Sequence, residues 1–100
     1  MALFMMFGKY TPEALRGISA DRTRQVQEIV ESNGGEVRAM YAVMGEHDLV
    51  FIFDLPDSDR AMMTAVAIEQ STGIMLRTSP VVEVEKFDRL VGKPQRVEKI

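Results

Sequence analysis

Residues 49–53, LVFIF, constrain the fold of this chain most, because they resemble a strand with no polar residue on either face. They follow a second strand-like run over residues 36–44, and the polar turn 45–48 joins the two. A small antiparallel sheet normally alternates between apolar residues that face its helices and polar residues that face water. A strand that is apolar on both faces therefore predicts a cover on each side of the sheet.

The length of the chain indicates where the second cover comes from. With 100 residues, the chain makes one domain with a modest core and has few elements to spare for a second layer. We therefore expect another subunit to cover the second face, in a homodimer or a higher even oligomer.

The composition of the chain limits the classes of partner and the cellular compartment that we expect. A formal net charge of −3 provides no basic surface for nucleic acid or for an acidic membrane, so neither is expected as a partner. The chain has no cysteine, which is typical of a reducing compartment and predicts a cytoplasmic protein. The apolar start, MALFMMFGKY, is too short to span a membrane and lacks a basic leader, so it predicts a first strand.

Local signals predict the order of the elements. After the strand at 2–10, Thr11, Pro12 and Glu13 form a helix start, and Gly17 and Ser19 interrupt that helix before a longer one over 21–32. The strand over 36–44 alternates, and the pattern places one set of residues toward the helices: Val37, Ala39, Tyr41 and Val43.

The second half of the chain is predicted in the same way. A helix over 60–72, apolar nearly all round, precedes a strand from 74 toward 85 that Pro80 interrupts. A short helix over 86–91 completes a single domain at 1–91, and a polar tail occupies 92–100. The order βαββαβ predicts an α+β, ferredoxin-like sandwich, and the packing of two open sheet faces would form a dimeric α+β barrel.

Four segments of the chain form a recognisable set: FGKYTPEAL at 7–15, Asp21 with Arg22, the glycine pair 34–35 and the turn GEHD at 45–48. With them, residues 3–90 resemble the GYD-domain family. The resemblance implies a dimeric α+β barrel without an established activity. The family usually has tyrosine before the aspartate of the turn, whereas this chain has His47.

The turn GEHD and its apolar strand, together with Gly73, Ile74 and the strand at residues 77–78, are more weakly similar to the effector-binding domains of leucine-responsive-type regulators, which bind small ligands between subunits. No helix-turn-helix precedes the domain in this chain. This second resemblance therefore implies a ligand-binding module that stands alone.

His47 is the only histidine and lies in the turn between the carboxylates Glu46 and Asp48. It is a candidate general base that Asp48 would orient. In the alternative interpretation, His47 is a solvated loop side chain and Asp48 bonds the amides of the turn.

Three further residues are candidate ligand contacts. Lys9, at the end of the first strand, would pair with an acidic ligand or remain in water. Arg22 falls on the expected apolar stripe of its helix, where it would bind an anionic ligand in the helix–sheet cleft or extend to water. Tyr41 would line a pocket or fill the core.

Other side chains favour structural interpretations. Arg38 and Arg77 are expected to face a second subunit and to pair with Glu83 or Glu36. The eight methionines are typical core fillers. No metal or cofactor is expected, because a single histidine without cysteine falls short of the usual ligand sets, and nothing else supports haem ligation by His47.

Three functions fit these observations. The first is an oligomeric protein that binds a small organic ligand in the helix–sheet cleft or between subunits, through Lys9, Arg22, Tyr41, His47 and Asp48. The second is a cofactor-independent isomerase or monooxygenase-like enzyme with His47 as base. The third is a structural assembly module that uses the apolar helix at 60–72 for further contacts.

Overall fold

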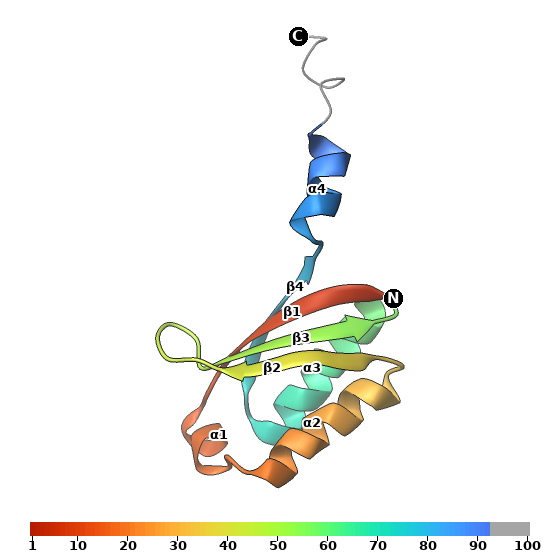
Figure 1. Cartoon of the computed structure of the whole chain (residues 1–100). Coiled ribbons are helices and arrows are strands. Elements are labelled where there is room, and N and C mark those ends of the chain that lie inside the picture. The colour runs from red at the N-terminus through yellow and green to blue at the C-terminus, as the bar shows by residue number, and fades with distance from the viewer. Residues whose placement is uncertain (93–100) are drawn as a thin grey trace.

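The computed structural model describes residues 1–92 and has a four-stranded antiparallel sheet with its long helices on one face (Figure 1). The strand order is β2-β3-β1-β4. The elements in chain order are β1 (Ala2–Lys9), α1 (Pro12–Arg16), α2 (Ala20–Ser32), β2 (Glu36–Ala42), β3 (Leu49–Leu55), α3 (Ser58–Thr72), β4 (Met75–Val81) and α4 (Val84–Val91). The predicted α+β, ferredoxin-like fold is confirmed.

Side-chain caps begin the first three helices. Thr11 Oγ1 accepts the N–H of Ala14 at 3.0 Å, and Ser19 Oγ accepts the N–H of Arg22 at 3.0 Å. Asp57 caps α3, which ends at Gly73 in the left-handed conformation with φ +79°. These helix boundaries follow the local signals of the sequence.

The core lies between the sheet and the pair α2 and α3. Every second side chain of the two central strands points into it, where it meets the inner faces of both helices. Its largest buried members include Phe4, Met6, Phe51, Phe53, Leu55, Val26, Val30 and Ile68. Burying such side chains contributes about 1.5–3 kcal/mol each, so this layer supplies most of the stability of the chain.

The opposite side of the two central strands is also apolar. We call it the open face and define it by five half-buried residues: Leu3, Met5, Phe7, Val50 and Ile52. Among the described residues no helix lies over it, as Figure 1 shows. The prediction that β3 is apolar on both faces is confirmed, and residues 1–92 cover only one of those faces.

Strand β2 departs from the predicted alternation. A bulge between Val37 and Ala39 adds Arg38 to the strand without a partner and shifts the register with β3. After the bulge, Met40 packs against the core, while Tyr41 is 58% exposed. The expectation that Tyr41 faces the helices is therefore wrong, because one extra residue reverses the direction of every later side chain.

Arg38 is engaged within its own chain. Its Nη2 donates to Oδ2 of Asp54 at 2.8 Å, and this hydrogen bond, together with the charge of Asp54, raises the pKa of the Arg38 guanidinium. We expected an ion pair with Glu36 or Glu83 of a second subunit. The bulge instead places Arg38 beside the carboxylate of the neighbouring strand.

Strand β4 is shorter than predicted, and α4 begins earlier than predicted. Strand β4 ends at Val81, and α4 already begins at Val84. The tail predicted at 92–100 lies, beyond Gly92, outside the described residues. Within residues 1–92, no helix has both the length and the apolar character needed to cross a bilayer.

Candidate functional site

The candidate site lies at the end of the sheet where β1 leads into α1 and the β2–β3 hairpin turns. Asp48 holds these segments together. Its backbone N–H donates to the carbonyl of Gly8 at 2.8 Å, and its carboxylate accepts the backbone N–H of Tyr10 at 2.8 Å. Its carbonyl accepts the N–H of Val43 at 2.9 Å. Tyr10 is therefore fixed where β1 meets the helix layer.

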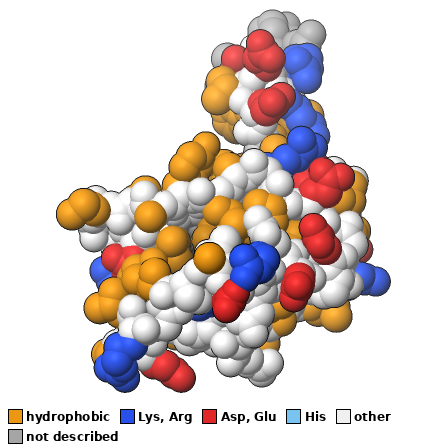
Figure 2. All heavy atoms as spheres, turned by 60° about the horizontal axis from the view of Figure 1, so that its bottom comes forward, with side chains coloured by type: hydrophobic (Ala, Val, Ile, Leu, Met, Phe, Trp, Pro, Cys, Tyr) orange, Lys and Arg blue, Asp and Glu red, His pale blue; other side chains and the backbone are white. Residues whose placement is uncertain are grey.

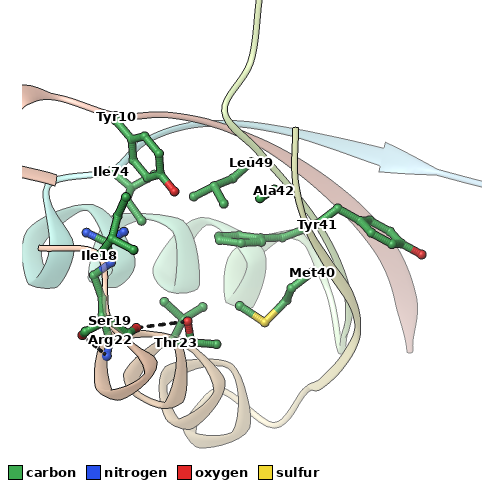
Figure 3. A pocket seen from close by; sticks show the side chains of 12 residues that line it. Tyr10, Ile18, Ser19, Arg22, Thr23, Met40, Tyr41, Ala42, Leu49 and Ile74 are labelled. Atoms are coloured by element: carbon green, nitrogen blue, oxygen red, sulfur yellow. Dashed lines mark hydrogen bonds between the residues drawn. The ribbon is translucent and has the colours of Figure 1, made fainter. Parts of the chain in front are cut away.

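A cleft of about 270 Å³ opens between α2 and this end of the sheet (Figure 3). Most of its lining is apolar and comes from both layers. The lining residues are Tyr10, Ile18, Ser19, Arg22, Thr23, Val26, Met40, Tyr41, Ala42, Leu49, Phe51 and Ile74. Figure 3 shows the hydroxyl of Tyr10 directed into the cleft and the ring of Tyr41 directed away from it.

Arg22 is the charged residue of this cleft. It is half-buried, and its guanidinium carbon lies 5.6 Å from the centre of the Tyr10 ring, within the range of a cation–π interaction. One of its Nη1 hydrogens donates to the carbonyl of Ala14 at the end of α1. A guanidinium has further N–H donors, so the remaining ones are available to an anionic group in the cleft.

A second hollow, of about 720 Å³, lies on the open face beside the hairpin. Lys9, His47 and Arg77 contribute basic side chains to it, and Phe7 and Met75 contribute apolar ones. The Lys9 ammonium donates to the backbone carbonyl of Glu46 at 2.9 Å, and the His47 ring lies 4.8 Å from the ring of Phe7. This hollow belongs to the sheet surface that the fold leaves uncovered.

The structure separates the five residues that the sequence indicated as one site. Arg22 and Tyr41 border the cleft, whereas Lys9 and His47 lie in the second hollow. Asp48 lines neither hollow, and its carboxylate accepts the backbone N–H of Tyr10. Residues 1–92 show no hydrogen bond that would let Asp48 orient His47 as a base.

Most residues that line the cleft, Tyr10 and Met40 among them, are not among the five predicted ligand contacts. Tyr10 follows the first strand directly, and this position could have indicated a side chain at the sheet edge. Met40 carried no such signal, because the bulge that turns it inward is a feature of the fold. Across the described part of the chain, no three His, Cys, Asp or Glu side chains gather closely enough to hold a metal ion.

The sequence matches the GYD domain over residues 4–91. No curated protein matches it in sequence. Among solved structures, the fold is similar to the crystal structure of Mycobacterium tuberculosis leucine response regulatory protein (LrpA), with a TM-score of 0.54 and 12% identity. The similarity covers 82% of this chain and 51% of that one, so this chain spans about half the length of the regulator.

Proposed function

This chain belongs to the GYD domain family, and from that premise we propose that it is a homo-oligomeric protein that binds a small organic ligand in the cleft beside α2. The observation that carries the proposal is Arg22, a half-buried guanidinium in a mostly apolar cleft, held by the ring of Tyr10 and the carbonyl of Ala14. Clefts with apolar walls and few polar groups are the usual form of small-molecule sites.

The cleft also supports a class of ligand. Its volume of about 270 Å³ is just below the range of roughly 300–1,000 Å³ typical for drug-sized ligands. A compound with a single ring or a short chain fits this space. An anionic group on it would accept hydrogen bonds from Arg22, and its apolar body would contact Met40 and Ile74.

The other predicted residues receive supporting roles in this proposal. Asp48 positions Tyr10, whose hydroxyl points into the cleft. Lys9 and His47 lie on the surface through which we propose that copies pair, since the open face is apolar and lacks a cover within residues 1–92. The acidic net charge and the absence of cysteine support a cytoplasmic protein that does not bind nucleic acid.

Benzoate tests the proposal, because it combines one ring with a carboxylate, and benzyl alcohol is its neutral counterpart. Each is titrated into the labelled protein while the methyl resonances of Met40 and Ile74 are followed by NMR. We expect benzoate to shift both resonances in a saturable way and to bind at least about tenfold more tightly than benzyl alcohol, because a charged hydrogen bond contributes about 1.5–3 kcal/mol.

The matched variants lie on the same helix. Arg22→Gln should remove the preference for benzoate, whereas Arg24→Gln should keep it, because Arg24 is exposed and pairs with Asp21 away from the cleft. Equal binding of the two probes to the unchanged protein, or a preference for benzoate that survives in Arg22→Gln, would contradict the proposal.

A further inference from the structure

Helix α4 extends away from the rest of the chain. None of its residues is buried, and it projects beyond the end of β4 (Figures 1 and 2). The radius of gyration is 16.2 Å, whereas a compact chain of this length has a value of about 13 Å. The described part of the chain therefore holds this helix as an arm rather than as part of its core.

The arm is amphipathic. Val84, Phe87 and Leu90 lie on one flank and are 72%, 52% and 61% exposed. The charged side chains of the helix, which include Glu85 and Asp88, lie apart from this flank, and Figure 2 shows apolar and charged side chains on different sides of the arm. A helix of only 8 residues is unstable alone in water, where about 12–15 residues are needed even for good helix formers. Its apolar flank therefore requires a surface to pack on.

The open face is a second apolar surface that residues 1–92 leave uncovered. The arm of the same copy is directed away from it, because α4 leaves the edge strand β4 through extended backbone at Glu83, with φ −66° and ψ 148°. A second copy has the same arm and the same open face. A two-fold axis would let each arm pack on the other copy, so one symmetric contact would cover both surfaces.

We propose that α4 of one copy packs its Val84, Phe87 and Leu90 flank on the open face of a second copy, in a reciprocal exchange of arms. The exchange rests on the proposed pairing through the open face. It identifies α4 as the element of each copy that packs on the open face of the other. Five uncharged apolar side chains define that face, which matches the apolar flank of the arm in chemistry.

Cysteine cross-linking tests the exchange directly, because the natural chain has no cysteine. Phe87→Cys protein, isotope-labelled, is mixed with unlabelled protein that carries Leu3→Cys, Met5→Cys or Ile52→Cys, and the mixture is oxidised. We expect a labelled–unlabelled covalent dimer with at least one open-face variant. Arg89→Cys, in the charged part of the arm, should give at least about tenfold less of it.

The remaining outcomes overturn the exchange. An internal disulfide in protein that carries both Phe87→Cys and Met5→Cys, with no cross-link between copies, would place the arm on its own sheet. Equal cross-linking from Phe87→Cys and Arg89→Cys would show no preference for the apolar flank, and no cross-link at all would leave the arm without this partner.

The dissociation constant of the dimer, measured by sedimentation, shows whether the arm exchange alone is wrong or the pairing of copies is wrong as well. Phe87→Ser with Leu90→Ser should raise the dissociation constant of the dimer by about tenfold or more, while Glu85→Ser with Asp88→Ser should change it little. An unchanged dimer in the first variant would overturn the exchange and leave the pairing intact. A monomer in the unchanged protein would overturn both.

Discussion

Asp48 shows how one residue connects three segments. Its backbone and carboxylate bond to Gly8, Tyr10 and Val43, so it closes the hairpin and ties it to the end of β1. The sequence indicated two roles for this carboxylate: to orient His47 as a base or to bond backbone amides near the turn. The geometry favours the second role, with the amide of Tyr10, directly after β1, as the donor.

We therefore expect Asp48→Ala to reduce the free energy of unfolding by about 1–3 kcal/mol, because it leaves the partly buried amide of Tyr10 without its acceptor. Urea denaturation measures this loss. Asp48→Asn, which keeps an acceptor oxygen, should cost less, and Glu46→Ala on the exposed turn should stay within about 0.5 kcal/mol of the unchanged protein. Equal losses in Asp48→Ala and Glu46→Ala would show that Asp48 does not hold the hairpin.

At the scale of elements, β2 sets the shape of the cleft. The strand starts at Glu36, directly after the buried Gly35, and the bulge two residues later turns Met40 toward the core. A Cβ atom added at Gly35 would lie 2.5 Å from the carbonyl oxygen of Asp54 and 2.5 Å from Leu55 Cδ2. Backbone and core side chains thus leave no room there, so a glycine is needed for β2 to approach β3.

Gly35→Ala should destabilise the protein by about 1–3 kcal/mol through overpacking, as measured by urea denaturation. Gly17→Ala is the control: Gly17 has φ −93°, and the nearest atom to its added Cβ would be the flexible Arg22 guanidinium at 3.2 Å. This control should change the stability by less than about 1 kcal/mol. An equally stable Gly35→Ala protein would mean that β2 shifts freely against β3.

At the scale of the whole molecule, both layers present apolar surface that the described part of the chain does not cover. The open face occupies one side of the sheet, and on the helix layer Met62, Met63 and Val66 of α3 are 67%, 56% and 50% exposed. Large exposed apolar patches usually mark interaction sites. The two surfaces fit two levels of assembly, a pair through the sheet and a higher even oligomer through α3.

Ile52→Lys tests the pairing through the sheet, because Ile52 lies opposite Met5 in the middle of the open face. A lysine there should raise the dissociation constant of the pair by more than about a hundredfold, because pairing would bury its charge without a partner. Sedimentation velocity reports the change, and circular dichroism checks that the fold remains. Glu28→Lys, on the exposed side of α2, should leave the pair intact.

Sedimentation velocity also tests the proposed assembly of pairs through α3. Met63→Glu should reduce any higher oligomer to the pair without dissociating the pair itself, because Met63 lies on the helix layer away from the open face. An Ile52→Lys protein with unchanged mass would contradict the pairing, and a Met63→Glu protein that dissociates fully to monomers would assign the pairing to α3 instead.

The sequence by itself determined the order of the elements, the helix start at Thr11, the starts of α2 and α3 to within two residues, the stop at Gly73 and the two apolar faces of β3. Caps, turns and periodicity depend on residues that are near in the chain, so local rules suffice for them.

Only the tertiary structure decided that Tyr41 faces outward, that Asp48 binds the amide of Tyr10, 38 residues away, and that Arg22 and His47 occupy different hollows. Each of these depends on strand register across the sheet. A single bulged residue changes that register without leaving a signal in the local pattern.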